Sequence, residues 1–335
     1  MFIKNEKDKT IDIIRVLLGV VTGFIFCKYT KIFFNFLTPM ITFSTLFYMN
    51  KFSIKLFIKK NWWIFGFSCI GLILSEILVG KPLIFAIITF GIFFSCFFFI
   101  HKNITGVNSG VLGYTFTTIY FTYASTPIES MVKDMTISIF ISGCIAWILF
   151  FIFPTGKANL DITKQEREDV HRDVFNTIKI TTIIFIVWLF YMFYDIKDTF
   201  FAYATLCGLY GNLSFNKIYV LTLPNILINI SGCILAIILS FFINGISTNP
   251  IIFSLSLMII FFPMLYFGYY EKTPKIKILS LSLIRATIFP IGLYLTPYGD
   301  IVSKAFARAL QITTMLIISM ILIKLLMIIK GEENE

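Results

Sequence analysis

The chain has 335 residues, of which 58% are hydrophobic and only 14% are charged, whereas soluble domains have roughly 45–50% apolar and about 25% charged residues. This composition excludes an ordinary soluble domain and indicates an integral membrane protein. The net charge of +10 does not indicate nucleic-acid binding, because the lysines and arginines gather in alternate loops between apolar stretches and form no single basic face.

Twelve apolar stretches follow one another along the chain, and most are close to the roughly 20 residues that a helix needs to cross a bilayer core about 30 Å thick. The first six lie near 12–28, 31–49, 61–79, 82–100, 107–123 and 133–153, and the second six near 179–194, 199–214, 221–243, 250–269, 276–297 and 304–329. We therefore expect an all-α integral membrane protein with about twelve transmembrane helices and no sizeable soluble domain.

The two sets of six stretches share proline positions at nearly the same spacing. A proline opens the fourth stretch of each set, and a Thr-Pro pair closes the fifth. These positions are Pro82 and Pro250, 168 residues apart, and Thr126-Pro127 and Thr296-Pro297, 170 residues apart. Because an even number of spans separates the two sets, both start on the same side of the membrane, which predicts two parallel six-helix repeats.

The predicted repeat divides the chain into a first transmembrane half, residues 1–154, a hydrophilic linker, residues 155–177, and a second half, residues 178–335. Lysines crowd into every second loop, and the positive-inside rule then places the linker and both termini in the cytoplasm. The basic N-terminus precedes an apolar run without a small-residue cleavage site, so we expect an uncleaved first span.

Polar side chains inside the predicted spans are candidates for a substrate path, since in lipid they are costly and face a partner helix or a watery cavity. Helical spacing places several of them on one face of the second and fifth spans, and the ninth span adds one more. The candidates are Asn35, Thr38, Thr42, Asn108, Thr115, Thr118 and Asn229. The alternative is ordinary helix packing, because threonine can bond its own backbone and small residues let helices approach closely.

Arg285 lies about nine residues into the eleventh span, a position that costs about 2.5–3.5 kcal/mol on insertion scales. A guanidinium is always charged and suits bidentate contact with a carboxylate, so Arg285 is the candidate anchor for an anionic substrate. The alternatives are a structural ion pair with a buried carboxylate, or a side chain that reaches the interface.

Glu76 is the candidate for proton coupling, although its place near the predicted outer end of the third span also suits exposure at the interface. The acids at other span ends, Asp12 among them, are expected to be solvated.

Residues for other chemistries are scarce. The chain has two histidines, six scattered cysteines without a C-x-x-C pair, and no G-x-x-x-x-G-K-[ST] phosphate loop, so we expect no metal, no cofactor and no ATP hydrolysis by this chain. A secondary transporter of organic anions is therefore favoured over an enzyme. A passive anion channel, a membrane-embedded lipid-processing enzyme and a structural scaffold stay open as alternatives, and so does a homo-oligomer.

The layout of two six-span halves resembles the fusaric acid resistance and aromatic acid exporter (FUSC-like) superfamily, and in length its DUF2955-type short bacterial branch. The local marks are the arginine that opens the first span in Ile14-Arg15-Val16-Leu17-Leu18-Gly19, Gly143 in the sixth span after Lys133-Asp134, and Lys304 with Arg308 in the last span. The resemblance implies a bacterial inner-membrane exporter of small aromatic carboxylates or related organic anions, often working with a periplasmic adaptor protein. Longer family members carry a large cytoplasmic domain where this chain has only its short linker.

Overall fold

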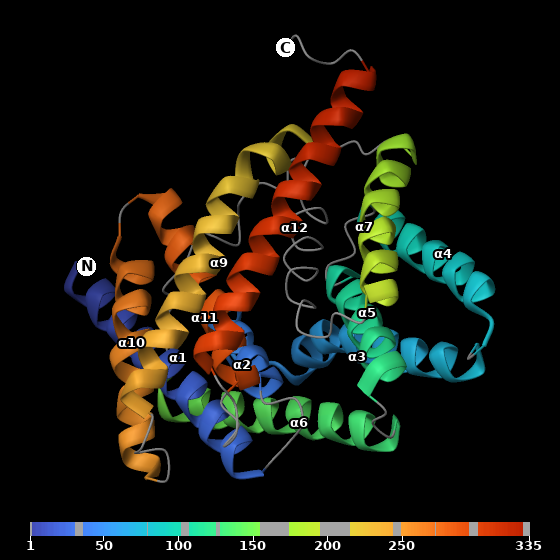
Figure 1. Cartoon of the computed structure of the whole chain (residues 1–335). Helices are drawn as coiled ribbons and strands as arrows, with labels where there is room; N and C mark the ends of the chain where they lie inside the picture. The colour runs from blue at the N-terminus through green and yellow to red at the C-terminus, as the bar shows by residue number, and fades with distance from the viewer. Residues whose placement is uncertain are drawn as a thin grey trace. The chain divides into compact units, whose positions relative to one another are not determined.

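The structure is a computed structural model, and it describes residues 2–30, 36–78, 80–101, 107–124, 128–154, 174–194, 215–243, 249–271, 273–294 and 301–330. Within these ranges the chain forms eleven α-helices and no strand (Figure 1). The helices are α1 (Phe2–Thr30), α2 (Leu37–Tyr48), α3 (Ile54–Ile77), α4 (Pro82–His101), α5 (Val107–Ala124), α6 (Ile128–Ile152), α7 (Val174–Tyr194), α9 (Phe215–Ile243), α10 (Pro250–Tyr270), α11 (Pro274–Tyr294) and α12 (Ile301–Lys330). The expected all-α class is thus confirmed for the described part of the chain.

Six of these helices are long and apolar enough to cross a membrane: Glu6–Thr30, Ile54–Ile77, Ser130–Ile152, Thr222–Phe242, Pro250–Tyr270 and Lys304–Lys324. Large apolar side chains also point outward, among them Leu83 at 80% and Phe151 at 81% exposure. Lipid covers such side chains at no hydrophobic cost, so the helices and their surfaces are those of a membrane-embedded protein.

Eleven of the twelve predicted stretches overlap a helix, while the eighth, 199–214, lies outside the described residues. Two prolines begin helices as their positions in the sequence predicted, Pro82 in α4 and Pro250 in α10. Proline suits the first turn because its fixed φ is already helical and its missing N–H needs no partner there. At α10 the Asn249 side chain also accepts a hydrogen bond from the Ile251 amide, at 2.9 Å, as an N-cap residue does.

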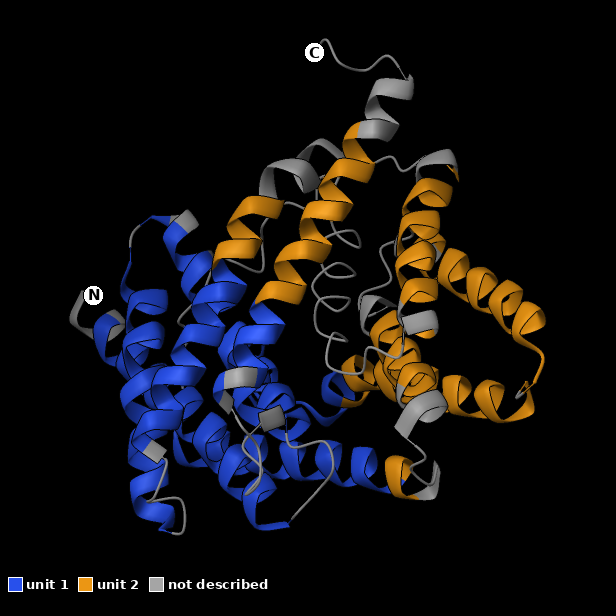
Figure 2. Ribbon diagram, viewed as in Figure 1, with its two compact units in different colours: residues 1–57, 133–166, 228–309 blue, residues 58–132, 167–227, 310–335 orange. Residues whose placement is uncertain are grey.

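The chain divides into two compact units (Figure 2). Unit 1 comprises residues 1–57, 133–166 and 228–309, and unit 2 comprises residues 58–132, 167–227 and 310–335. Each unit contains segments of both predicted halves. Residues 155–173 of the predicted linker lie outside the described residues, and the division into half, linker and half stays a prediction about the sequence repeat.

The core of unit 1 forms where α1 packs against α2 and α10. Phe24 of α1 stacks on Phe261 of α10, with ring centroids 6.1 Å apart, and Phe47 of α2 meets Tyr269 of α10 edge to face at 6.0 Å. Both arrangements are favoured aromatic geometries. Aromatic side chains thus fix the three helices around one apolar core.

Two glycines let α1 approach α2 closely. A Cβ atom at Gly23 would lie 2.8 Å from the Pro39 Cα, and one at Gly19 would meet the side chains of Leu46, Thr42 and Leu149. Gly19 and Gly23 are four residues apart and so lie on one helix face. This is the small-residue spacing by which membrane helices bring their backbones together.

The core of unit 2 is an aromatic cluster in which α4 packs on α5 and α7. The Trp188 indole of α7 is 1% exposed, and its centroid lies 5.5 Å from the Phe85 ring and 6.3 Å from the Phe93 ring, both on α4. Phe93 also contacts Tyr114 of α5 edge to face at 5.8 Å. These rings account for part of the high phenylalanine content as interhelical packing.

Candidate substrate-binding site

Arg285 lies near the middle of α11, as the sequence predicted, and its side chain is half-buried. Its Nη2 atom donates a hydrogen bond to the hydroxyl of Tyr48, the last residue of α2. The guanidinium carbon lies 5.1 Å from the centroid of the Tyr48 ring, within the range of a cation–π contact. Since α11 packs against α2, both contacts follow from the way these two helices meet in unit 1.

The Arg285 guanidinium has no carboxylate partner among the residues that the structure describes. Its contacts with Tyr48 are to a hydroxyl and an aromatic face, and neither is a carboxylate. The structural ion pair that the sequence left open as an alternative therefore has no partner within the described ranges. An arginine in this state can accept an anion.

A second arginine and two further rings adjoin the same face of α11. Phe289 follows Arg285 by one helical turn, and its ring lies 5.5 Å from that of Phe36, next to the start of α2. The Arg308 guanidinium carbon of α12 lies 5.8 Å from the Phe289 centroid, and Arg308 is only 2% exposed. We call Arg285, Tyr48, Phe289, Phe36 and Arg308 the arginine–aromatic cluster; all five belong to unit 1.

The threonines predicted on the second span are fully buried between helices of unit 1. The methyl group of Thr42 would lie 3.1 Å from a Cβ atom at Gly19 of α1. The Thr38 carbonyl accepts a hydrogen bond from Ser142 Oγ of α6 at 3.1 Å. Asn35, from the same predicted stripe, lies outside the described residues. These contacts are the helix packing that the sequence offered as the alternative, while a role in lining a path stays a prediction.

The threonines predicted on the fifth span are also fully buried, but they belong to unit 2. Thr118 Oγ1 donates to the Thr115 carbonyl at 3.0 Å and accepts a hydrogen bond from Trp188 Nε1 at 3.3 Å. The Thr115 hydroxyl is buried without a hydrogen-bond partner among the described residues. Asn108 lies in the first turn of α5, and its side chain is outside the described part.

The remaining two candidates lie in different units. Asn229 of α9 is 8% exposed and belongs to unit 1, three residues before Gly232, where a Cβ would lie 2.7 Å from the Ala286 backbone of α11. Glu76 belongs to unit 2 and is the penultimate residue of α3, with an exposed side chain. An exposed position at the end of α3 agrees with the alternative that the sequence named, and both interfacial exposure and proton coupling by Glu76 stay predictions.

The sequence reasoning missed three buried charges, Asp12, Arg15 and Arg308. Asp12 was expected to be solvated, but it is 5% exposed and pairs with Arg15, with Asp12 Oδ1 and Arg15 Nη2 2.7 Å apart. The expectation was wrong because α1 begins at Phe2 and not near residue 12, so Asp12 lies well inside the helix and under its neighbours. Arg308 was used only to compare the last span with a known family. The burial of Arg308 could have been suspected from the sequence, since Lys304, Arg308 and Gln311 follow helical spacing on one face.

The hydroxyl of Tyr114 offers a direct test of the polar contacts in unit 2. It hydrogen-bonds Thr89 Oγ1 at 2.8 Å in a buried position, so we expect Tyr114→Phe to lower the free energy of unfolding by about 1 kcal/mol. The matched control is Tyr29→Phe on α1, where the tyrosine is 53% exposed and no change is expected. Denaturant titration in bicelles measures both variants, and equal stability of the two would contradict the buried bond.

Comparison with protein-family models, with curated proteins and with solved structures finds no match for this chain.

Proposed function

We propose that this chain is a secondary transporter of the bacterial inner membrane that exports small organic anions, aromatic carboxylates among them. The proposal includes about twelve spans in two parallel six-helix repeats, both termini in the cytoplasm, and membership of the FUSC-like superfamily with its periplasmic adaptor. The observation that carries it is the Arg285 guanidinium in the middle of an apolar helix, with only the Tyr48 hydroxyl and ring as partners among the described residues.

The arginine–aromatic cluster supports an aromatic anion in particular. Arg285 supplies a fixed positive charge for a carboxylate, and the Tyr48 ring lies against its guanidinium; Phe289, one helical turn along α11, and Phe36 add a further pair of rings. An aromatic ring stacks favourably on such side chains, and a carboxylate pairs with a guanidinium. The proposed substrate class rests on these two chemistries, which α11 and α2 bring together in unit 1.

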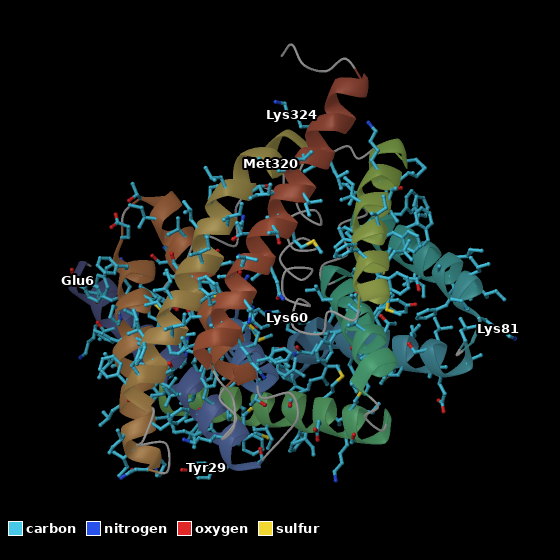
Figure 3. The ribbon with its side chains drawn as sticks, viewed as in Figure 1. Glu6, Tyr29, Lys60, Lys81, Met320 and Lys324 are labelled. Atoms are coloured by element: carbon cyan, nitrogen blue, oxygen red, sulfur yellow. The ribbon has the colours of Figure 1, made fainter. Side chains whose placement is uncertain are left out.

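The experiment is flux of labelled aromatic carboxylates in proteoliposomes, with and without a pH gradient. A charge-assisted hydrogen bond contributes about 1.5–3 kcal/mol, so Arg285→Ala should lower transport by roughly tenfold to a hundredfold, and Arg285→Lys should restore part of it. The matched control is Lys324→Ala, which removes one exposed positive charge from α12 (Figure 3).

The outcomes separate the candidate functions. Gradient-driven flux that Arg285→Ala lowers by that amount and Lys324→Ala preserves would support a coupled exporter with Arg285 as its anion anchor. Flux that needs no gradient and saturates weakly would favour the passive anion channel. Absence of flux of any organic anion in well-folded wild-type protein would refute both and favour the enzyme or the scaffold.

A further inference from the structure

The first two turns of α3 carry a basic stripe beside an apolar one. Lys51, Lys55 and Lys59 recur at intervals of four residues, and all three are exposed. Since residues four apart share a helix face, Lys55 and Lys59 stand one above the other, with Lys51 in the turn just before the helix. The lysine-rich loop of the sequence therefore continues into α3 as a basic stripe on one helix face.

The apolar stripe is offset from the lysines by one residue. Ile54, Ile58 and Trp62 follow the same spacing and are 64%, 54% and 62% exposed. A buried side chain, Phe57, holds this part of the helix in place: its ring lies 5.9 Å from that of Phe52, and a Cβ at Gly143 of α6 would lie 3.1 Å from it. The two stripes are thus presented outward by a helix that is anchored from the other side.

The basic stripe is far in sequence from any acidic residue. The sequence contains no aspartate or glutamate between Asp12 and Glu76. Within the described ranges, Lys51, Lys55 and Lys59 have no carboxylate partner. The basic stripe, next to exposed isoleucines and a tryptophan, complements a ligand that has an anionic head and an apolar tail.

We propose that these two stripes at the start of α3 bind an anionic phospholipid, with the lysines on its phosphate-bearing headgroup and Ile54, Ile58 and Trp62 along its acyl chains. Trp62 marks the depth of the interface, where amphipathic rings are enriched. Juxtamembrane lysines gain affinity from anionic lipid at the surface. This site shares no residue with the arginine–aromatic cluster and does not rest on the transport proposal.

The test is lipid binding to the delipidated full chain in a neutral detergent, followed by native mass spectrometry. Phosphatidylglycerol and phosphatidylcholine with identical acyl chains are titrated separately. Each lysine is worth about fivefold in affinity for anionic lipid, so Lys55→Gln combined with Lys59→Gln should weaken phosphatidylglycerol binding roughly 25-fold and leave phosphatidylcholine binding unchanged. The control combines Lys81→Gln and Lys133→Gln, which removes the same charge from two exposed sites; Lys81 lies at the turn between α3 and α4 (Figure 3).

A second measurement keeps the proposal testable if the lysine variant does not fold. Phosphatidylglycerol with brominated acyl chains should quench the fluorescence of the wild-type chain more than that of Trp62→Phe. Unchanged phosphatidylglycerol affinity in the lysine variant, equal wild-type affinity for both lipids, or quenching that is the same with and without Trp62 would each overturn the site. Displacement of the lipid by millimolar inorganic phosphate would also overturn it, because it would mark a site for the free anion.

Discussion

Replacing Arg15 by methionine is expected to lower the free energy of unfolding by about 3–5 kcal/mol, because it leaves the Asp12 carboxylate in a buried site without its arginine. The two side chains are 3% and 6% exposed and 2.7 Å apart at Nη2 and Oδ1. Arg15 also donates from Nη1 to the Phe153 carbonyl at 3.4 Å, and its guanidinium carbon lies 4.2 Å from the Phe150 centroid. One side chain thus joins α1 to the end of α6.

The double variant Asp12→Leu with Arg15→Met separates the pair from its surroundings. Replacing both charges by apolar groups removes the uncompensated carboxylate, so at least half of the lost stability should return. Unfolding in bicelles with a denaturant series, applied to the wild type, Asp12→Leu, Arg15→Met and the double variant, supplies the four free energies of the cycle. A single variant that stays within about 1 kcal/mol of wild type would show that the pair does not stabilise unit 1.

Gly23→Ala is expected to destabilise the protein by about 1–3 kcal/mol, the usual range for overpacking a close-packed contact. The added methyl would lie 2.8 Å from the Pro39 Cα and 3.1 Å from its nitrogen. These are backbone atoms of α2 and cannot rotate away, so the two helices would have to separate. Thermal unfolding in detergent shows whether Gly23→Ala lowers the stability, and denaturant titration measures the change in the free energy of unfolding.

Gly91 in α4 is the matched control because a Cβ there meets nothing within 4 Å. Alanine is favoured over glycine inside a helix by up to about 1 kcal/mol, so Gly91→Ala should be neutral or stabilising. The stability of Gly19→Ala should lie between those of Gly23→Ala and Gly91→Ala, since the atom nearest to the added methyl is the movable end of the Leu46 side chain. If Gly23→Ala were as stable as Gly91→Ala, the close approach of α1 and α2 would be refuted.

Hydropathy located most helices because each apolar stretch in lipid must bond its own backbone, and a helix does this within one segment. The same reasoning misplaced the first residue of some helices. It set the third span near residue 61, whereas α3 begins at Ile54, because lysines lower the apolar signal without breaking a helix. The apolar pattern marks the lipid-facing length, and the helix continues into the interface.

The candidate site was predictable only in part. Arg285 stands out in the sequence as a permanent charge inside an apolar stretch, and its place near the middle of α11 follows from counting residues. The partner of Arg285 could not be predicted from the sequence, because Tyr48 lies 237 residues away along the chain. The stripes of threonine were equally visible, but periodicity says only that residues share a face and not what that face meets. In unit 1 that face meets Gly19 of α1 and Ser142 of α6.

The sequence by itself determined the class of the protein, the positions of most helices, the two proline starts and the presence of a charge within the eleventh span. These properties depend on short stretches of chain and on the bilayer as solvent. Only the tertiary structure decided that Asp12 and Arg15 are buried together, that Arg308 is covered, and that Arg285 bonds a tyrosine. Burial and partner choice depend on how distant helices pack, and in this chain small residues such as Gly23 set that packing.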